Sequence, residues 1–232
     1  DQKKKFKVTK TDARDQYNPE RHDVFDPKIR PDKLIKQYRG EGRDGPIYDT
    51  ALQPVTRIGF PYQKLVVERF IGLMLGNKIQ LTPEFFDEKE DNEASELFDR
   101  TRRVWHNTKL DFKNRDILRR LLSEMEVAEY WYVTEEDDEL ARDKHKFNVK
   151  IFSPESGDEL FPFFDQSGRM IAFFRGYSVE GEEGKKVDRM DVFTRDFTYW
   201  LVKGDVGYTY EKPPQPNLLK KIPIVYYRQD AP

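Results

Sequence analysis

The sequence predicts an α+β fold in which helices come first and antiparallel strands follow. Three segments between residues 60 and 125 repeat apolar residues at helical spacing, whereas the chain beyond residue 130 consists of β-favouring runs separated by turn formers. Helices that precede a block of strands, instead of alternating with them, indicate an α+β domain. With 232 residues, the chain can bury one good core and carry an appended arm.

Residues 1–56 are predicted to be a charged N-terminal arm with one short helix, and residues 57–232 to be the α+β domain. Residues 1–30 are poor in apolar side chains and rich in turn formers, so they bury too little surface to fold alone. We expect them to lie on a neighbouring surface or to be disordered. Residues 32–38 are the helix candidate, and residues 40–46 are predicted to form a loop.

Three helices are expected at the start of the domain. The first lies within residues 60–81, where Pro61 suits a first helical turn and Gly76 suits the left-handed residue after the end, with a short strand beyond it. Apolar residues cover more than one face of this helix, so it is predicted to be the most buried element. The other two helices are predicted at about 93–106 and 114–125, each with an apolar stripe.

The remainder of the domain is predicted to be antiparallel sheet. The strands are expected at residues 130–133, 147–152, 160–164, 169–177, 187–194, 199–203 and 222–227. The acidic run 135–139 between the first two is predicted to be a solvated hairpin loop. The aromatic residues of these strands are expected to form sheet core and not a stacking platform for nucleic-acid bases: Phe163, Phe164, Phe173 and Phe174.

The composition excludes several classes of function. Charged residues make up 36% of the chain, above the roughly 25% of an average globular protein, which indicates long solvated faces or charge-paired contacts with neighbours. The formal net charge of -2 is atypical of a protein that holds DNA tightly by neutralising phosphates. The absence of cysteine excludes disulfides, thiolate nucleophiles, zinc ribbons and iron–sulfur clusters.

The chain shows no targeting segment. No apolar run is long enough to span a bilayer, and the N-terminus lacks the apolar core of a secretion signal, so we expect a soluble protein from a reducing compartment. The chain begins at Asp1 without methionine and stops at Pro232 directly after a strand-like run. We therefore expect it to be part of a longer polypeptide.

No catalytic, cofactor-binding or metal-binding residues are predicted. The histidines are far apart in sequence and have no partner at metal-ligand spacing: His22, His106 and His145. The glycine-rich segment 40–45 lacks the strand, the helix and the Lys-Ser/Thr pair of a phosphate loop, so it is predicted to be a turn. The consecutive acids 135–139 would point their carboxylates in all directions, which is unsuited to a metal site.

One basic cluster is a candidate contact for a neighbouring subunit or for DNA. Its members are Arg100, Arg102 and Arg103. Acidic residues precede them on the same predicted helix, so a salt-bridge network along that helix is the alternative interpretation. Lys3-Lys4-Lys5 is a second basic segment that suits an acidic partner.

Several short motifs, in chain order, resemble the portal proteins of tailed bacteriophages, in particular the siphophage portals. In residues 57–68 a basic residue and an aromatic residue lead into an apolar helix. Ser153-Pro154 precedes an apolar-Pro-apolar segment that ends at Asp165, and an Ile-Pro strand lies at 222–227. The order and spacing of these motifs across residues 31–228 are similar to those of that family.

The resemblance implies that the chain is the wing region of a portal subunit and ends before the stem and clip. Portal subunits form dodecameric, homo-oligomeric rings, the head–tail connector at one capsid vertex, whose channel serves DNA packaging and ejection. The implied partners are terminase, major capsid and scaffold proteins, head–tail connector proteins and double-stranded DNA, with no cofactor and no membrane. The implied role is structural and not enzymatic, in the virion and, during assembly, in the host cytoplasm.

Two other functions remain as alternatives. The first is a phage-encoded metal-dependent nuclease, which would need acids from separate strands to meet around a metal: Asp158, Asp165 and Asp191. The second is a generic capsid or adaptor binding module. A bound manganese ion with DNA nicking would indicate the nuclease, and the failure to form a large closed ring without partners would indicate the adaptor.

Overall fold

The computed structural model describes residues 9–82, 91–135, 145–180 and 184–229, and confirms the predicted α+β class. Within these ranges the chain forms four α-helices and ten strands, and the strands make three antiparallel sheets. The chain divides into two compact units, Asp1–Val67 and Glu68–Pro232. None of the helices in the described ranges has the length and hydropathy of a bilayer span.

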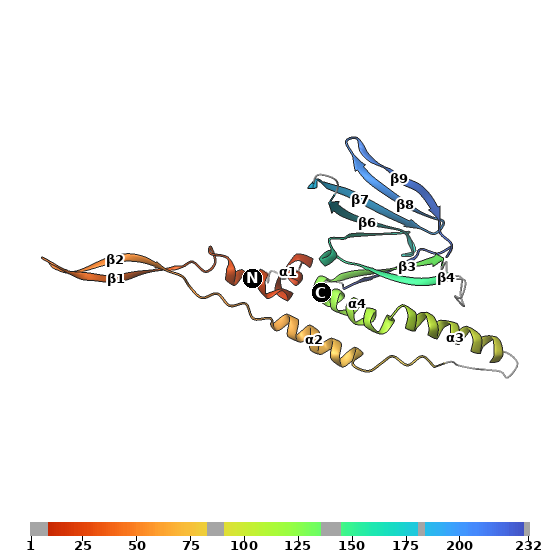
Figure 1. Cartoon of the computed structure of the whole chain (residues 1–232), viewed down its shortest axis with the longest axis horizontal. Helices are drawn as coiled ribbons and strands as arrows, with labels where there is room; N and C mark the ends of the chain where they lie inside the picture. The colour runs from red at the N-terminus through yellow and green to blue at the C-terminus, as the bar shows by residue number, and fades with distance from the viewer. Residues whose placement is uncertain (1–8, 83–90, 136–144, 181–183, 230–232) are drawn as a thin grey trace. The chain divides into compact units, whose positions relative to one another are not determined.

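The first unit contains a short helix and a long hairpin (Figure 1). Helix α1, Lys10–Tyr17, begins with a capping box in which Thr9 and Asp12 bond each other's backbone N–H, and it buries no residue. Two short 3-10 helices, η1 (Pro19–Arg21) and η2 (Asp23–Phe25), follow it. These elements were not predicted, because short-range capping and turn bonds, rather than an apolar stripe, define them.

Strands β1 (Lys33–Gly42) and β2 (Gly45–Gln53) form a two-stranded hairpin, so the helix predicted at residues 32–38 is wrong. The apolar spacing of this short run is compatible with a helix or with a strand, and the run forms a strand because it pairs with β2. The predicted loop at 40–46 is the tip of this hairpin, where the turn lies between Gly42 and Gly45. Gly45 has a φ of 119°, which a residue with a side chain rarely adopts.

The three predicted helices are confirmed as α2 (Tyr62–Leu75), α3 (Asp91–Asn107) and α4 (Leu110–Glu124). The prediction that the first is the most buried element is wrong. Ile71 is its one buried residue, while Leu73 is 85% exposed. The strand expected near residues 79–81 is also absent, because no described strand pairs with this segment. Helix α4 buries more, including Leu110 and Ile117.

A three-stranded sheet of order β10-β3-β4 and a five-stranded sheet of order β5-β6-β7-β8-β9 make up the β-rich part. The first contains β3 (Glu126–Glu135), β4 (His145–Phe152) and β10 (Ile224–Arg228). The second contains β5 (Glu159–Phe164), β6 (Met170–Glu180), β7 (Lys186–Thr194), β8 (Phe197–Gly204) and β9 (Gly207–Pro216). A short 3-10 helix η3, Pro154–Ser156, joins the two sheets.

All seven predicted strands are present, and β9 is the strand of this part that was missed. Its prolines argue against a central strand, but β9 lies at the edge of its sheet, where missing N–H donors are tolerated. Of the predicted acidic loop at 135–139, Glu135 ends β3 and the other residues lie outside the described ranges.

The core lies between the two sheets. Its buried apolar residues come from both of them: Ala128, Phe152, Leu160, Phe173, Phe193 and Ile224. Helix α4 packs on β3 from the other side, which gives three layers: five-stranded sheet, three-stranded sheet and helix (Figure 1). Phe173 is core as predicted, whereas Phe163 and Phe164 are exposed, because Phe163 lies on the outer face of the five-stranded sheet and Phe164 lies at a register shift.

Candidate functional site

The predicted basic cluster on α3 is split by the helix geometry. Arg102 and Arg103 line a shallow depression of about 270 Å³ together with Asp99 and His106, all on one face of the helix. Arg100 points elsewhere and pairs with Glu96 at 2.6 Å, as the salt-bridge interpretation expected. Both members of that pair are largely exposed, so the pair contributes little to stability. The depression therefore remains the candidate contact surface for an acidic group.

A charged cluster is buried between the two sheets. The guanidinium of Arg175 on β6 lies 2.7 Å from Asp158 Oδ1 and 3.1 Å from Asp191 Oδ2. It also stacks on Phe152 and Tyr177, with its central carbon 4.2 and 4.0 Å from the ring centres. Burial raises the pKa of Asp191, and the charge and hydrogen bonds of Arg175 oppose this shift. The ion pairs tie β6 to β7 and to the segment before β5, and the ring contact with Phe152 of β4 connects the cluster to the three-stranded sheet.

This cluster bears on the nuclease alternative. Asp158 and Asp191 do come together, but the Arg175 guanidinium occupies the position between them that a metal would need. Asp165 lies in the β5–β6 turn, where it accepts hydrogen bonds from the backbone N–H groups of Ser167 and Arg169. Among the residues that the structure describes, no three histidine, aspartate or glutamate side chains are grouped to hold a metal ion.

The histidines lie in three separate environments. His22 contacts the Gln16 carbonyl oxygen at 2.9 Å, His106 lines the α3 depression, and His145 is the first residue of β4. The basic segment Lys3-Lys4-Lys5 lies outside the described ranges. The described histidines therefore do not form a common site.

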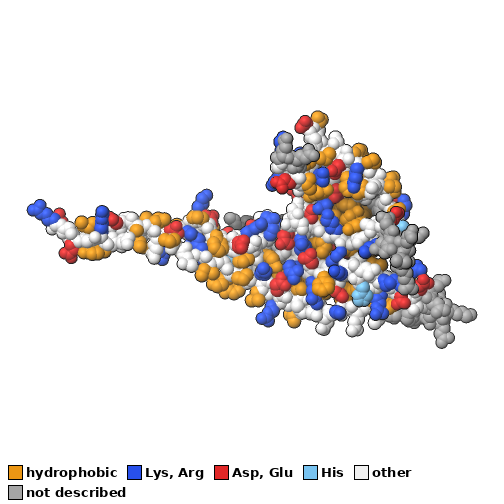
Figure 2. Space-filling view, viewed as in Figure 1, with side chains coloured by type: hydrophobic (Ala, Val, Ile, Leu, Met, Phe, Trp, Pro, Cys, Tyr) orange, Lys and Arg blue, Asp and Glu red, His pale blue; other side chains and the backbone are white. Residues whose placement is uncertain are grey.

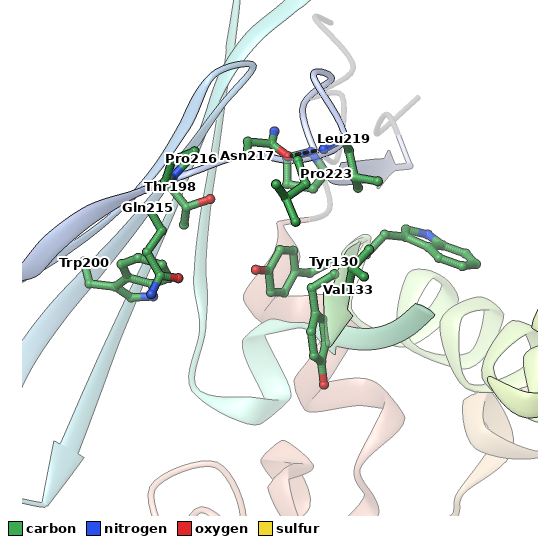
Figure 3. Close-up of a pocket in the computed structure, with 12 residues that line it drawn as sticks. Tyr130, Val133, Thr198, Trp200, Gln215, Pro216, Asn217, Leu219 and Pro223 are labelled. Carbon is green, nitrogen blue, oxygen red and sulfur yellow. Dashed lines mark hydrogen bonds between the residues drawn. The ribbon is translucent and has the colours of Figure 1, made fainter. Parts of the chain in front are cut away.

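Figure 3 shows a pocket of about 150 Å³ where the two sheets diverge. Tyr130 points into it from the three-stranded sheet, and Thr198 and Trp200 from the five-stranded sheet. Asn217 also lines the pocket. Its side-chain amide donates hydrogen bonds to the carbonyl oxygens of Thr194, Arg195 and Lys221 and so fixes the loop around it. The volume is below the roughly 300 Å³ of a typical ligand site, so the pocket is a packing feature of the sandwich.

Buried acids under the three-stranded sheet are satisfied by aromatic donors. Glu129 accepts hydrogen bonds from the Tyr227 hydroxyl at 2.8 Å and from Trp131 Nε1 at 2.9 Å. Burial, with the bond to Glu129, raises the pKa of Tyr227 to about 12. Burial, with the charge of Asp191, raises the pKa of Tyr130 to about 12. The bond between Tyr227 and Glu129 joins β10 to β3.

Many large apolar side chains of the described residues are exposed, and Figure 2 shows hydrophobic side chains along the hairpin. The residues lie on the hairpin, on α2 and on the outer face of the five-stranded sheet, and include Leu34, Leu52, Leu73, Phe161 and Tyr210. Large exposed apolar surfaces mark interaction sites. The hairpin was not predicted from the sequence, although the Asp44-Gly45 pair between two apolar runs is a hairpin signal.

Comparison with protein families gives one result for nearly the whole chain. Residues 7–231 match the family described as "Phage portal protein, SPP1 Gp6-like". The match covers parts of both units, including the hairpin, the helices and both sheets of the β-rich part. A comparison with curated proteins finds no match.

Proposed function

Because the chain belongs to the SPP1 Gp6-like family of phage portal proteins, we propose that it is a structural subunit of the ring-shaped head–tail connector at a capsid vertex. The ring surrounds the channel through which double-stranded DNA is packaged and ejected. The subunit catalyses no reaction itself and binds no cofactor. The observation that carries this proposal is the family match across residues 7–231.

In this proposal residues 57–232 correspond to the wing of the subunit, residues 1–56 are an arm, and the ring is a dodecamer. The partners are neighbouring subunits, terminase, the major capsid and scaffold proteins, the head–tail connector proteins and DNA in the channel. The ring resides in the virion and passes through the host cytoplasm during assembly.

Two properties of the chain support the proposal. Its exposed apolar residues suit repeated contacts between subunits, which bury such surface on assembly. Its net charge of -2 suits a channel wall that lets DNA slide, because strong binding to phosphates would hold the DNA in place. Arg102 and Arg103 on α3 are the proposed contact for an acidic group of a neighbour or for DNA.

Electron microscopy and native mass measurement of the purified full-length protein test the proposal. The expected result is a closed ring of identical subunits with an axial channel. A protein that forms no closed ring without partners would support the adaptor alternative and overturn the ring proposal. Nicking of plasmid DNA with manganese, lost in the Asp158→Asn and Asp191→Asn variants, would instead support the nuclease.

A further inference from the structure

We propose that the apolar face of the β1–β2 hairpin docks on the outer face of the five-stranded sheet of a second copy of this chain. This proposal rests on the ring proposed above and names one of the contacts between neighbours. Both surfaces consist of described residues, the hairpin in the first unit and the sheet in the second.

One face of the hairpin carries two exposed apolar or aromatic pairs, with Lys36 and Thr50 paired between them. Leu34 pairs with Leu52 and Tyr38 with Tyr48, and alternation places these four side chains on the same side of the ribbon. They are 71%, 64%, 56% and 52% exposed, respectively. The Tyr38 and Tyr48 rings contact each other edge to face, with their centres 5.9 Å apart, so the two rings hold each other in a defined position across the strands.

The opposite face of the hairpin carries the smaller apolar pair Ile35 and Ala51 and an ion pair between Arg39 and Asp49. A two-stranded hairpin by itself is at best marginally stable in water, because it has no second layer on which to bury side chains. The hairpin therefore requires a surface that covers its apolar face.

The five-stranded sheet offers such a surface on the side away from the core. The cross-strand row Phe161, Phe174, Val192 and Tyr199 alternates with the inward-facing row that contains Phe173 and Phe193. Within this outer row Phe161 is exposed, Phe174 and Tyr199 are half-buried, and Val192 is buried by its neighbours. Tyr199 contacts Phe197 and Tyr210, with ring centres 6.2 and 6.3 Å apart. The exposed aromatic side chains of this face therefore lie on β5 and on β8 and β9, on either side of the buried Val192.

This outer face has a polar border. Asp188 on β7 accepts a hydrogen bond from the Ser178 hydroxyl at 2.8 Å and pairs with Lys203 at 3.1 Å. Apolar residues in the centre and polar residues at the rim are typical of protein interfaces. Both surfaces are faces of antiparallel β-structure, and two such layers pack with their side chains interdigitated.

A second copy of the chain is the favoured occupant for two reasons. First, the hairpin face and the sheet face are different surfaces, so a contact between them is heterologous. When two copies bind in this way, one copy still has an unoccupied hairpin face and the other an unoccupied sheet face, and each can bind a further copy. A ring closes by repeating such a contact. Second, a net charge of -2 gives copies little electrostatic repulsion to overcome on approach.

Single engineered cysteines test the contact, because the chain has no cysteine of its own. Thr50→Cys lies on the apolar face of the hairpin, between Tyr48 and Leu52, and Ala172→Cys lies on the outer face of the sheet. The two full-length variants are mixed, allowed to assemble and treated with a short bismaleimide. Asp49→Cys, on the opposite face of the hairpin, is the matched control for Thr50→Cys.

The expected result is a covalent dimer from the Thr50→Cys and Ala172→Cys mixture and none from Asp49→Cys with Ala172→Cys. Adding Tyr48→Asp to the hairpin variant should abolish the dimer. Rings without this cross-link would overturn the docking proposal and leave the portal function intact. A chain carrying both cysteines that links only within itself would show docking in cis and also overturn it. Absence of rings from the unmodified protein would instead count against the proposed function.

Discussion

The hairpin and the packed pair of sheets are both antiparallel β-structure, yet their aromatic side chains have opposite environments. Tyr38 and Tyr48 of the hairpin are exposed, whereas Phe173 and Phe193 are at most 1% exposed. The local pairing is equally regular in both regions. The difference is a second layer, since the five-stranded sheet faces the three-stranded sheet and the hairpin faces no other sheet in its unit.

This comparison indicates that aromatic content and strand propensity do not determine burial by themselves. In the sheet pair, the second layer is provided by the same unit, so its residues are expected to determine the stability of the chain. In the hairpin the apolar face has no such layer, so its residues are expected to act on association between chains. The following predictions test this division of roles.

The largest loss of stability is expected for Arg175→Ala. The substitution leaves the carboxylates of Asp158 and Asp191 buried without their cation, which costs roughly 3–5 kcal/mol, with the upper end expected for two carboxylates. Denaturant unfolding of the full chain measures the change. Arg169→Ala removes an exposed arginine and should change the free energy of unfolding by less than about 0.5 kcal/mol.

A triple variant separates charge from packing in this cluster. Arg175→Met with Asp158→Asn and Asp191→Asn removes all three charges together and should recover much of the lost stability. If Arg175→Ala unfolds at the same denaturant concentration as the unmodified chain, the cluster does not stabilise the packed sheets.

A matched pair of aromatic truncations tests the comparison directly. Phe173→Ala opens a cavity in the core and should lower the free energy of unfolding by about 4 kcal/mol. Tyr38→Ala removes an exposed ring and should cost the isolated chain about 0.5 kcal/mol, while weakening assembly. Equal losses in monomer stability would mean that the hairpin is packed as firmly as the sheets.

The sequence predicted the elements whose pattern is local and periodic. Helix α4 and strand β6 have apolar spacing that matches their structures, so both were found within a few residues of their bounds. Burial was harder to predict, because it depends on which element supplies the second layer. Helix α2 is apolar on several faces and was expected in the core, yet within the described chain it buries mainly Ile71.

The candidate site was predicted less well for the same reason. Arg100, Arg102 and Arg103 are close in sequence, but helical rotation places Arg100 with Glu96 and the other two at the α3 depression. Asp158, Arg175 and Asp191 come from three different strands or loops, and only the sheet register brings them together. A sequence pattern contains no direct signal for such pairing.

Alkaline titration should destabilise the sheet pair by a smaller amount. The pKa values of Tyr130 and Tyr227 are raised from 10 to about 12, so the folded state holds these protons more tightly than the unfolded state. Their contribution to stability is complete below pH 10 and is lost as the pH rises from 10 towards 12. Melting temperatures across this range should fall more steeply for the unmodified chain than for Tyr130→Phe with Tyr227→Phe. Equal slopes would show that burial of the two phenols is not linked to folding.

The smallest effect on stability is expected for Leu73→Asp in α2. Leu73 is 85% exposed, so the substitution places the carboxylate in water and adds only a small loss of helix propensity, about 0.5 kcal/mol in total. Ile71→Asp is the matched control, because the same charge two residues earlier enters a buried position and should cost several kcal/mol. Denaturant unfolding at concentrations where the chain is monomeric measures both. If Leu73→Asp lowers the free energy of unfolding as much as Ile71→Asp does, Leu73 is packed within the monomer. That side of α2 would then stabilise the single chain and not its association with another. The expected result is that the two variants differ and that Leu73→Asp lowers only the yield of assembled protein. In that case the exposed apolar residues of α2 behave like those of the hairpin: they have no second layer in their own chain and stabilise contacts with another chain.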